Sequence, residues 1–296
     1  MPIKEIKKHS CRSRFVLSAR NFSIPLGDKT KIMGIMNITP DSFSRDGLLA
    51  RNKGRLSAVA FAQKLIKEGA DLLDIGGESS RPGARAISAD EEIRRIIPTI
   101  QKLAKQNTIP ISVDTYKPLV ARHALDAGAG IVNNIMGITP DKNLLKMARN
   151  YDAVVILMHM KGTPRTMQKN IHYKNLIKEI LAALKNSIEN CLDIGIKSDR
   201  IVLDPGIGFA KTVRDNLEII HRLAEFRKLK RPILIGTSRK SFIGQILNKE
   251  VNDRVLGTAA TVCASILGGA HIVRVHDVAA MKEVASVTDA ILNIDY

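Results

Sequence analysis

The chain has 296 residues, and its 46 Lys and Arg side chains outnumber 29 Asp and Glu side chains, which gives a formal net charge of +17. Hydrophobic residues make up 45% of the sequence and charged residues 25%, the balance of a soluble globular protein, which excludes disorder, collagen and coiled coil. The positive charge favours anionic partners. Nucleic-acid binding usually adds exposed aromatic side chains; the chain has no Trp and only 4% aromatic residues, so we expect no nucleic-acid partner.

The cysteines and the amino terminus bear on where the protein resides. Cys11, Cys191 and Cys263 are odd in number and far apart, so they predict neither a disulfide framework nor a CxxC metal site. The first segment, MPIKEIKKHSCRSRF, has no apolar run ahead of a small-residue cleavage site, which argues against a secretory signal. We therefore expect the protein in the reducing cytoplasm, with a mitochondrial transit peptide as the weaker alternative.

Residues 1–30 precede the first predicted strand and form an N-terminal extension. Their apolar pieces, 15–17 and 22–26, predict a hairpin that closes the bottom of the fold. From residue 31 to residue 296 the composition is uniform and offers no linker, so we expect a single domain there.

Short apolar runs then alternate with helical patterns eight times along the chain. The strands are predicted at 31–37, 72–78, 111–115, 131–135, 154–160, 201–205, 232–238 and 271–277. Each run is almost continuously hydrophobic, as expected for a strand covered on both faces. Between them, apolar residues recur at helical spacing, as at Ile93, Ile96 and Ile100. Eight strands that are each followed by a helix predict an α/β protein, a (β/α)8 TIM barrel.

The stretch 255–273 has no Lys, Arg, Asp or Glu and is long enough to raise the possibility of a membrane span. The adjacent pair Gly268 and Gly269 interrupts it where a buried helix would end. We therefore expect a helix, a turn and the last strand, and no membrane association.

Polar residues gather where the predicted strands end, and in barrels of this kind the chemistry lies at those ends. They are Asn37; Glu78 with Ser79, Ser80 and Arg81; Asp114; Asn133 with Asn134; His159; Asp204; Ser238 with Arg239 and Lys240; and Arg274 with His276. Any one of them is readily explained as a helix cap or a turn residue. Convergence of all eight ends on one face instead predicts an active site.

Two carboxylates stand out, because Asp114 and Asp204 close apolar strands and need partners that donate hydrogen bonds. A heterocycle with adjacent N–H groups fits that need, and the amide of Asn133 can both donate to and accept from such a ring. The alternative for Asp204 is a turn, since Pro205 and Gly206 follow it.

Four basic residues from three strand ends predict an anion clamp: Arg81, Lys240, Arg274 and His276. The sequence GTSRKS at 236–241 lacks the spacing of a Walker loop, and Gly206 and Gly208 lack the third glycine of a dinucleotide fingerprint. The predicted anion site is therefore of neither nucleotide-binding type.

Read in order, the strand ends resemble the dihydropteroate synthase family of pterin-binding barrels. The matching pieces are MGIMNITPDSFS at 33–44, DIGGESSRPGA at 74–84, SVDT at 112–115, IVNN at 131–134, LMHM at 157–160, DPGIGFAK at 204–211, GTSRKSFIG at 236–244 and RVHDV at 274–278. They run from the first strand to the last, so the resemblance covers the whole barrel.

The resemblance implies a transferase of folate biosynthesis that condenses 6-hydroxymethyl-7,8-dihydropterin pyrophosphate with 4-aminobenzoate, assisted by Mg²⁺. The residues implied to hold the pterin ring are Asp114, Asn133, Asp204 and Lys240, with Met158 and Phe209 packed nearby. Those implied for pyrophosphate are Asn37, Ser80, Arg81, Arg274 and His276, and Asn37 is also implied to approach Mg²⁺. Those implied to shape the aminobenzoate pocket are Phe43, Pro82, Lys240 and Ser241. We expect Asp114, Asp204 and Lys240 to be the catalytic residues, and the protein to be a homodimer.

The chain departs from the family pattern at three places. Ser80 replaces a usual Thr, the neutral Asn134 replaces a usual Asp, and Arg45 is inserted in the first loop, 38–54, which is long enough to be a lid. Three alternatives stay open: a methyltetrahydrofolate:corrinoid methyltransferase, a catalytically degenerate paralogue that binds pterin, and a basic RNA-binding protein.

Overall fold

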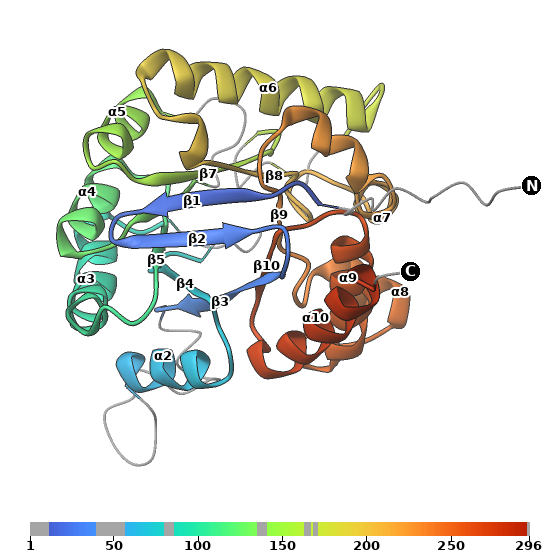
Figure 1. Ribbon diagram of the computed structural model, residues 1–296, viewed down its shortest axis with the longest axis horizontal. Coiled ribbons are helices and arrows are strands. Elements are labelled where there is room, and N and C mark those ends of the chain that lie inside the picture. Colours follow the sequence, from blue (N-terminus) through green and yellow to red (C-terminus); the bar gives the residue numbers. More distant parts are fainter. Residues whose placement is uncertain are drawn as a thin grey trace, which may run out of the picture.

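The computed structural model describes residues 12–39, 57–79, 86–134, 141–162, 167 and 171–294, and its centre is a sheet of eight parallel strands (Figure 1). The strands are β3 (Lys31–Asn37), β4 (Leu72–Gly76), β5 (Ile111–Asp114), β6 (Ile131–Asn134), β7 (Val154–Met158), β8 (Ile201–Asp204), β9 (Leu234–Ile235) and β10 (Ile272–Val275). They follow the order β8-β7-β6-β5-β4-β3-β10-β9. A parallel bridge between Leu203 and Ile233 joins the two ends of the sheet. The predicted (β/α)8 barrel is confirmed.

Helices surround the strands (Figure 1). They are α2 (Ala58–Lys67), α3 (Ala89–Gln106), α4 (Pro118–Ala127), α5 (Lys142–Asn150), α6 (Leu176–Ile194), α7 (Val213–His221), α8 (Ser241–Leu247), α9 (Val255–Leu267) and α10 (Val278–Leu292), with short 3₁₀ turns at Ser198–Arg200, Leu223–Leu229 and Val251–Asp253. The predicted helical spacing is reflected in α3, where Ile96 and Ile100 are fully buried. The side chain of Ser88 accepts a hydrogen bond from the amide of Glu91 and caps this helix.

Seven of the eight strands are shorter than predicted, and β9 differs most: it spans two residues instead of 232–238. Residues after Ile235 enter a turn in which the amide of Lys240 donates to the carbonyl of Thr237 at 3.2 Å and Arg239 has a φ of 57°. A strand cannot continue through a left-handed residue, so the chain leaves the sheet here and carries Lys240 to the barrel mouth.

The N-terminal hairpin forms as expected from β1 (Phe15–Ala19) and β2 (Phe22–Leu26), which pair antiparallel. Leu17 and Leu26 pack with Met33, Leu72 and other side chains from the beginnings of the barrel strands. The hairpin therefore closes the barrel at the end opposite the carboxyl ends of the strands.

The predicted helix, turn and strand at 255–273 are confirmed as α9, the Gly268–Gly269 turn and β10. Helices long and apolar enough to cross a bilayer are absent from the described residues.

Candidate active site

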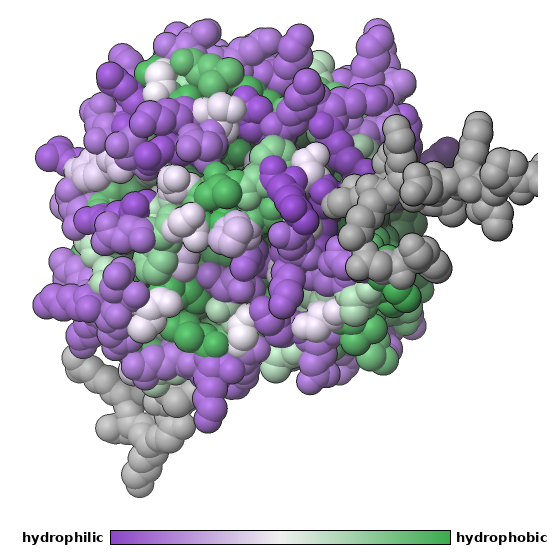
Figure 2. All heavy atoms as spheres, in the orientation of Figure 1, coloured by the Kyte–Doolittle hydropathy of each residue, from purple (hydrophilic) through white to green (hydrophobic). Residues whose placement is uncertain are grey.

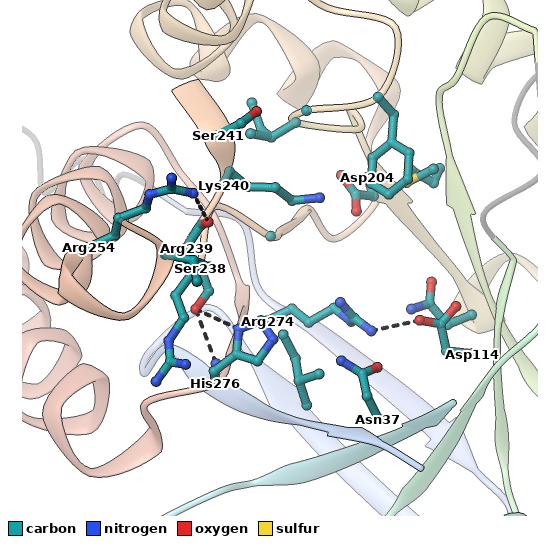
Figure 3. A pocket seen from close by; sticks show the side chains of 18 of the residues that line it. Asn37, Asp114, Asp204, Ser238, Arg239, Lys240, Ser241, Arg254, Arg274 and His276 are labelled. Atoms are coloured by element: carbon teal, nitrogen blue, oxygen red, sulfur yellow. Dashed lines mark hydrogen bonds and ion pairs between the residues drawn. The ribbon is translucent and has the colours of Figure 1, made fainter. Parts of the chain in front are cut away.

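A cavity of about 400 Å³ opens at the carboxyl ends of the strands (Figure 3). Ten of the residues proposed from the sequence line it: Asn37, Asp114, Asn133, Met158, Asp204, Phe209, Lys240, Ser241, Arg274 and His276. The other four, Phe43, Ser80, Arg81 and Pro82, lie outside the described residues, as do Arg45 and most of the predicted lid. The barrel thus brings together residues that are spread over most of the sequence.

An arginine between two acids forms the floor of this cavity. Arg274, on β10, donates from Nε to Oδ2 of Asp74 at 2.5 Å and from Nη2 to Oδ2 of Asp114 at 2.7 Å. The same Asp74 oxygen accepts from Nδ2 of Asn133 at 3.0 Å. Asp74 is completely buried, so its charge holds both the guanidinium and the amide in fixed orientations.

The Oδ1 atom of Asp114 can accept a further hydrogen bond. This oxygen is buried and has no hydrogen-bond partner within the described part of the chain. Burial raises the pKa of Asp114 to about 7, against the opposing effect of Arg274, and Asp74 raises it further. A ligand N–H that meets this oxygen would satisfy a group that is otherwise costly to bury.

The Asp204 carboxylate takes part in a turn and also lines the cavity. Its Oδ1 accepts from the amide of Gly206 at 2.7 Å, which is the turn role considered from the sequence, and its side chain also lines the cavity. Burial raises the pKa of Asp204, whereas the Gly206 amide, Lys240 and Lys211 lower it. The turn contact orients the carboxylate without removing it from the site.

Lys240 extends across the cavity toward Asp204 (Figure 3). Its Nζ lies 4.1 Å from the centre of the Phe209 ring, a cation–π contact. Burial and then Arg274 lower the pKa of Lys240 to about 8, although Asp204 and Asp114 oppose the shift. Phe209 packs in turn against Met158 and Met167. These residues form an apolar wall of the cavity, and the Lys240 ammonium lies against it.

His276 and Arg239 differ in charge and in the partners that already hold them. Nδ1 of His276 lies 3.0 Å from Oγ of Ser238, and burial followed by Arg274 lowers the pKa of His276 to about 3. The imidazole is thus neutral near pH 7 and can donate a hydrogen bond but no charge. Arg239 is held by Asp277 through two hydrogen bonds, at 3.0 and 2.5 Å.

Sequence reasoning did not single out Asp74, Lys211 or Arg254 as functional residues. Arg254 lines the cavity and donates from Nη1 to the carbonyl of Arg239 at 3.0 Å. Asp74 lies within the quoted DIGGESSRPGA motif, two residues after the inward-facing Leu72. Since side chains on a strand alternate, this position predicts an acid pointing into the barrel, and that signal could have found it.

A metal site made by the protein alone is not evident. In residues 12–39, 57–79 and the later described ranges, no group of three His, Cys, Asp or Glu side chains is placed to hold an ion. Asn37, at the end of β3, contributes one side-chain amide to the cavity wall.

Comparison with known proteins agrees with this site. A family model described as pterin binding enzyme matches residues 33–276. The chain belongs to the pterin binding enzyme family. Dihydropteroate synthase of Synechocystis sp. is 46% identical over 266 residues, which cover 90% of this chain and 91% of that protein. The family resemblance recognised in the strand-end motifs is confirmed.

Two crystal structures from this family superpose closely. Dihydropteroate synthase of Yersinia pestis in a sulfonamide drug complex has a TM-score of 0.87 at 37% identity, covering 95% of this chain and 100% of that one. The enzyme of Xanthomonas albilineans with 4-aminobenzoic acid has a TM-score of 0.86 at 37% identity, covering 96% and 100%. These two enzymes therefore share this barrel over the full length of their own chains.

Proposed function

We propose that the protein is a dihydropteroate synthase, which joins 6-hydroxymethyl-7,8-dihydropterin pyrophosphate to 4-aminobenzoate and releases pyrophosphate. The observation that carries this proposal is the cavity, which is lined by the carboxylates of Asp114 and Asp204 and by the amide of Asn133. A pterin ring presents adjacent N–H donors and a carbonyl acceptor, which match these groups. The relatives' names point to the same reaction.

In this reaction the bond between the pterin methylene carbon and the pyrophosphate oxygen breaks, and the aminobenzoate nitrogen bonds to that carbon. The amine then loses a proton, and pyrophosphate leaves with the bonding electron pair. Asp114 and Asp204 would favour positive charge that spreads into the pterin ring as the bond breaks. Arg274 and His276 would donate hydrogen bonds to the departing anion, and Lys240 would contribute charge between the two substrates. An arylamine is nucleophilic when neutral, so no strong base is required.

Mg²⁺ remains part of this proposal. The side-chain oxygen of Asn37 is a hard, neutral ligand, and Mg²⁺ is commonly bound by one or two protein oxygens together with substrate phosphates and water. Asn37 lines the cavity and would be the protein ligand of such an ion. When bound, the ion would neutralise charge on the pyrophosphate.

The direct test is to incubate the purified protein with pterin pyrophosphate, 4-aminobenzoate and Mg²⁺ and to detect dihydropteroate by mass. Product formation supports the proposal. A protein that binds pterin but forms no product would be the degenerate paralogue, and methyl transfer from methyltetrahydrofolate to a corrinoid would identify the methyltransferase. Salt-sensitive RNA binding in place of pterin binding would favour the RNA-binding alternative.

A homodimer is proposed as well, with a second copy covering the apolar faces of α9 and α10. These helices pack against each other, and Leu256 on α9 is 76% exposed while Val287 and Ile291 on α10 are each 62% exposed. Figure 2 shows apolar side chains gathered at the edge of the molecule near α8 and α9. Self-association would bury them.

Light scattering should give the mass of a dimer, and Leu256→Glu with Ile291→Glu should give a monomer. Residence in the cytoplasm stays a prediction.

A further inference from the structure

Lys211 is a buried lysine just below the candidate site, at the end of the loop that follows β8. It is 4% exposed. Within the described residues no carboxylate forms an ion pair with its ammonium. Instead Nζ lies 2.9 Å from the carbonyl oxygen of Phe209, 3.3 Å from the carbonyl oxygen of His159 and 3.1 Å from Nδ1 of His159. Lys211 thus links the loop to the segment after β7.

The atoms around Lys211 can accept the hydrogen bonds that an ammonium donates. Burial, followed by the charge of Lys211, lowers the pKa of His159 to about 3, so this imidazole is neutral and its Nδ1 can accept a hydrogen bond. Two carbonyls and one imidazole nitrogen therefore provide three acceptors for the three N–H bonds of an ammonium. Burial also lowers the pKa of Lys211 itself, to about 7, which shows how costly the charge is at this position.

The loop that Lys211 holds is tightly packed. Gly206 has a φ of 75°, and a Cβ there would overlap the carbonyl oxygen of His159. Ala210 also has a positive φ, 53°. The loop backbone is therefore packed tightly against the end of β7. The Lys211 ammonium holds the carbonyl of Phe209, which lies between Gly206 and Ala210 in this loop.

The Phe209 side chain is the part of this loop that meets the site. Its ring lies 4.1 Å from Nζ of Lys240 and packs with Met158 on the apolar wall of the cavity. A change at the Phe209 carbonyl would rotate or shift the residue that carries this ring. Lys211 lines no part of the cavity itself, so it acts on the site through the loop and, because its charge lowers the pKa of Asp204, through that carboxylate.

We propose that Lys211 is a positioning residue: by holding the Phe209 carbonyl against the segment after β7, it sets the Phe209 ring against Lys240 and the pterin. The proposal deepens the function given above and rests on it. A methionine in place of Lys211 keeps the apolar stem and removes the three donors.

The experiment is a double-mutant cycle of Lys211→Met and Phe209→Leu, read by the affinity for 6-hydroxymethylpterin in calorimetry and by kcat/KM for both substrates. Because hydrogen bonds to a charged group are lost, Lys211→Met should lower pterin affinity and kcat/KM by about 10-fold to 100-fold. In the Phe209→Leu background the same change should have less than about a threefold effect, since the ring it positions is gone. A residue needed only for folding would give additive losses.

Lys161→Met is the matched control. Its Nζ also donates to a carbonyl, that of His172 at 3.1 Å, and to Glu179 at 2.6 Å, but it holds no part of the Phe209 loop. We expect wild-type kinetics from this control. Should Lys211→Met be too unstable to purify, Lys211→Gln, which keeps two N–H donors but no charge, takes its place with the same expected non-additivity.

Two results would overturn the proposal: wild-type affinity and kcat/KM in a folded Lys211 variant, or additive effects in the cycle. Absence of dihydropteroate formation by the wild-type protein would contradict the proposed function instead. The calorimetric arm of the cycle would still test Lys211 in that case, because it needs no turnover.

Discussion

Replacing Lys240 by methionine removes one ammonium from the site and leaves the shape of the side chain nearly unchanged. In the wild-type protein this ammonium faces Asp204 and the Phe209 ring, and the charges of Asp204 and Asp114 favour it. A hydrogen bond to a charged group contributes about 1.5–3 kcal/mol. At 1.36 kcal/mol for each factor of ten, loss of one such contact in the transition state lowers kcat/KM by about 13-fold to 160-fold.

The pH profile tests the same residue independently. Since the pKa of Lys240 is about 8, the ammonium is present below pH 8 and is lost as the pH rises through that value. The pKa of Asp114 is about 7, so its carboxylate is lost as the pH falls through 7. We expect a bell-shaped profile of kcat/KM. The pKa of Lys211 is also lowered, to about 7, so the two lysines are separated by making Lys240→Met in the Lys211→Met background, where it should remove the remaining alkaline limb.

The assay is steady-state formation of dihydropteroate between pH 5 and 10, with Lys228→Met as the control. Lys228 is exposed and its nearest carboxylate, on Glu225, is 3.6 Å away, so its replacement should leave kcat/KM unchanged. Equal, small effects at Lys240 and Lys228, or an alkaline limb that persists when Lys240→Met is made in the Lys211→Met background, would refute the role assigned to the Lys240 ammonium.

Three further predictions concern the pterin, the metal and the fold. Asp204→Asn keeps an oxygen for the Gly206 amide but removes the charge, so calorimetry should show pterin binding weakened by about 1.5–3 kcal/mol in a folded protein; unchanged affinity would leave Asp204 as a turn residue only. Chelation by excess EDTA should slow turnover strongly and added Mg²⁺ should restore it; rates indifferent to both would count against the metal. Arg12→Met breaks a buried ion pair with Asp289, 2.6 Å long, and should lower the free energy of unfolding by about 3–5 kcal/mol in urea titrations. The exposed Arg14 is the control, and a comparable loss in Arg14→Met would contradict the argument.

Most of the candidate site could be predicted because a barrel places its strand ends on one face. Asn37, Asp114 and Asp204 each end an apolar run in the sequence, and Arg274 lies one residue before the end of the last run. The parallel sheet brings all four to the same cavity. The partners of these residues could not be predicted in the same way. Asp74 lies inside an apolar run, and Lys211 is one of many basic residues in a chain with +17 net charge.

The sequence by itself determined the order, direction and approximate limits of the strands. Hydrophobic periodicity, and the residues that end helices and strands, are local properties of the chain. Only the tertiary structure decided which side chains of the site contact one another and how their pKa values are shifted. Arg274 meets Asp74 and Asp114 across 200 and 160 residues of sequence, and only closure of the barrel sets the distances between them. Burial then lowers the pKa values of Lys211 and Lys240 and raises that of Asp114, since the cost of a charge depends on what surrounds it rather than on its neighbours in the chain.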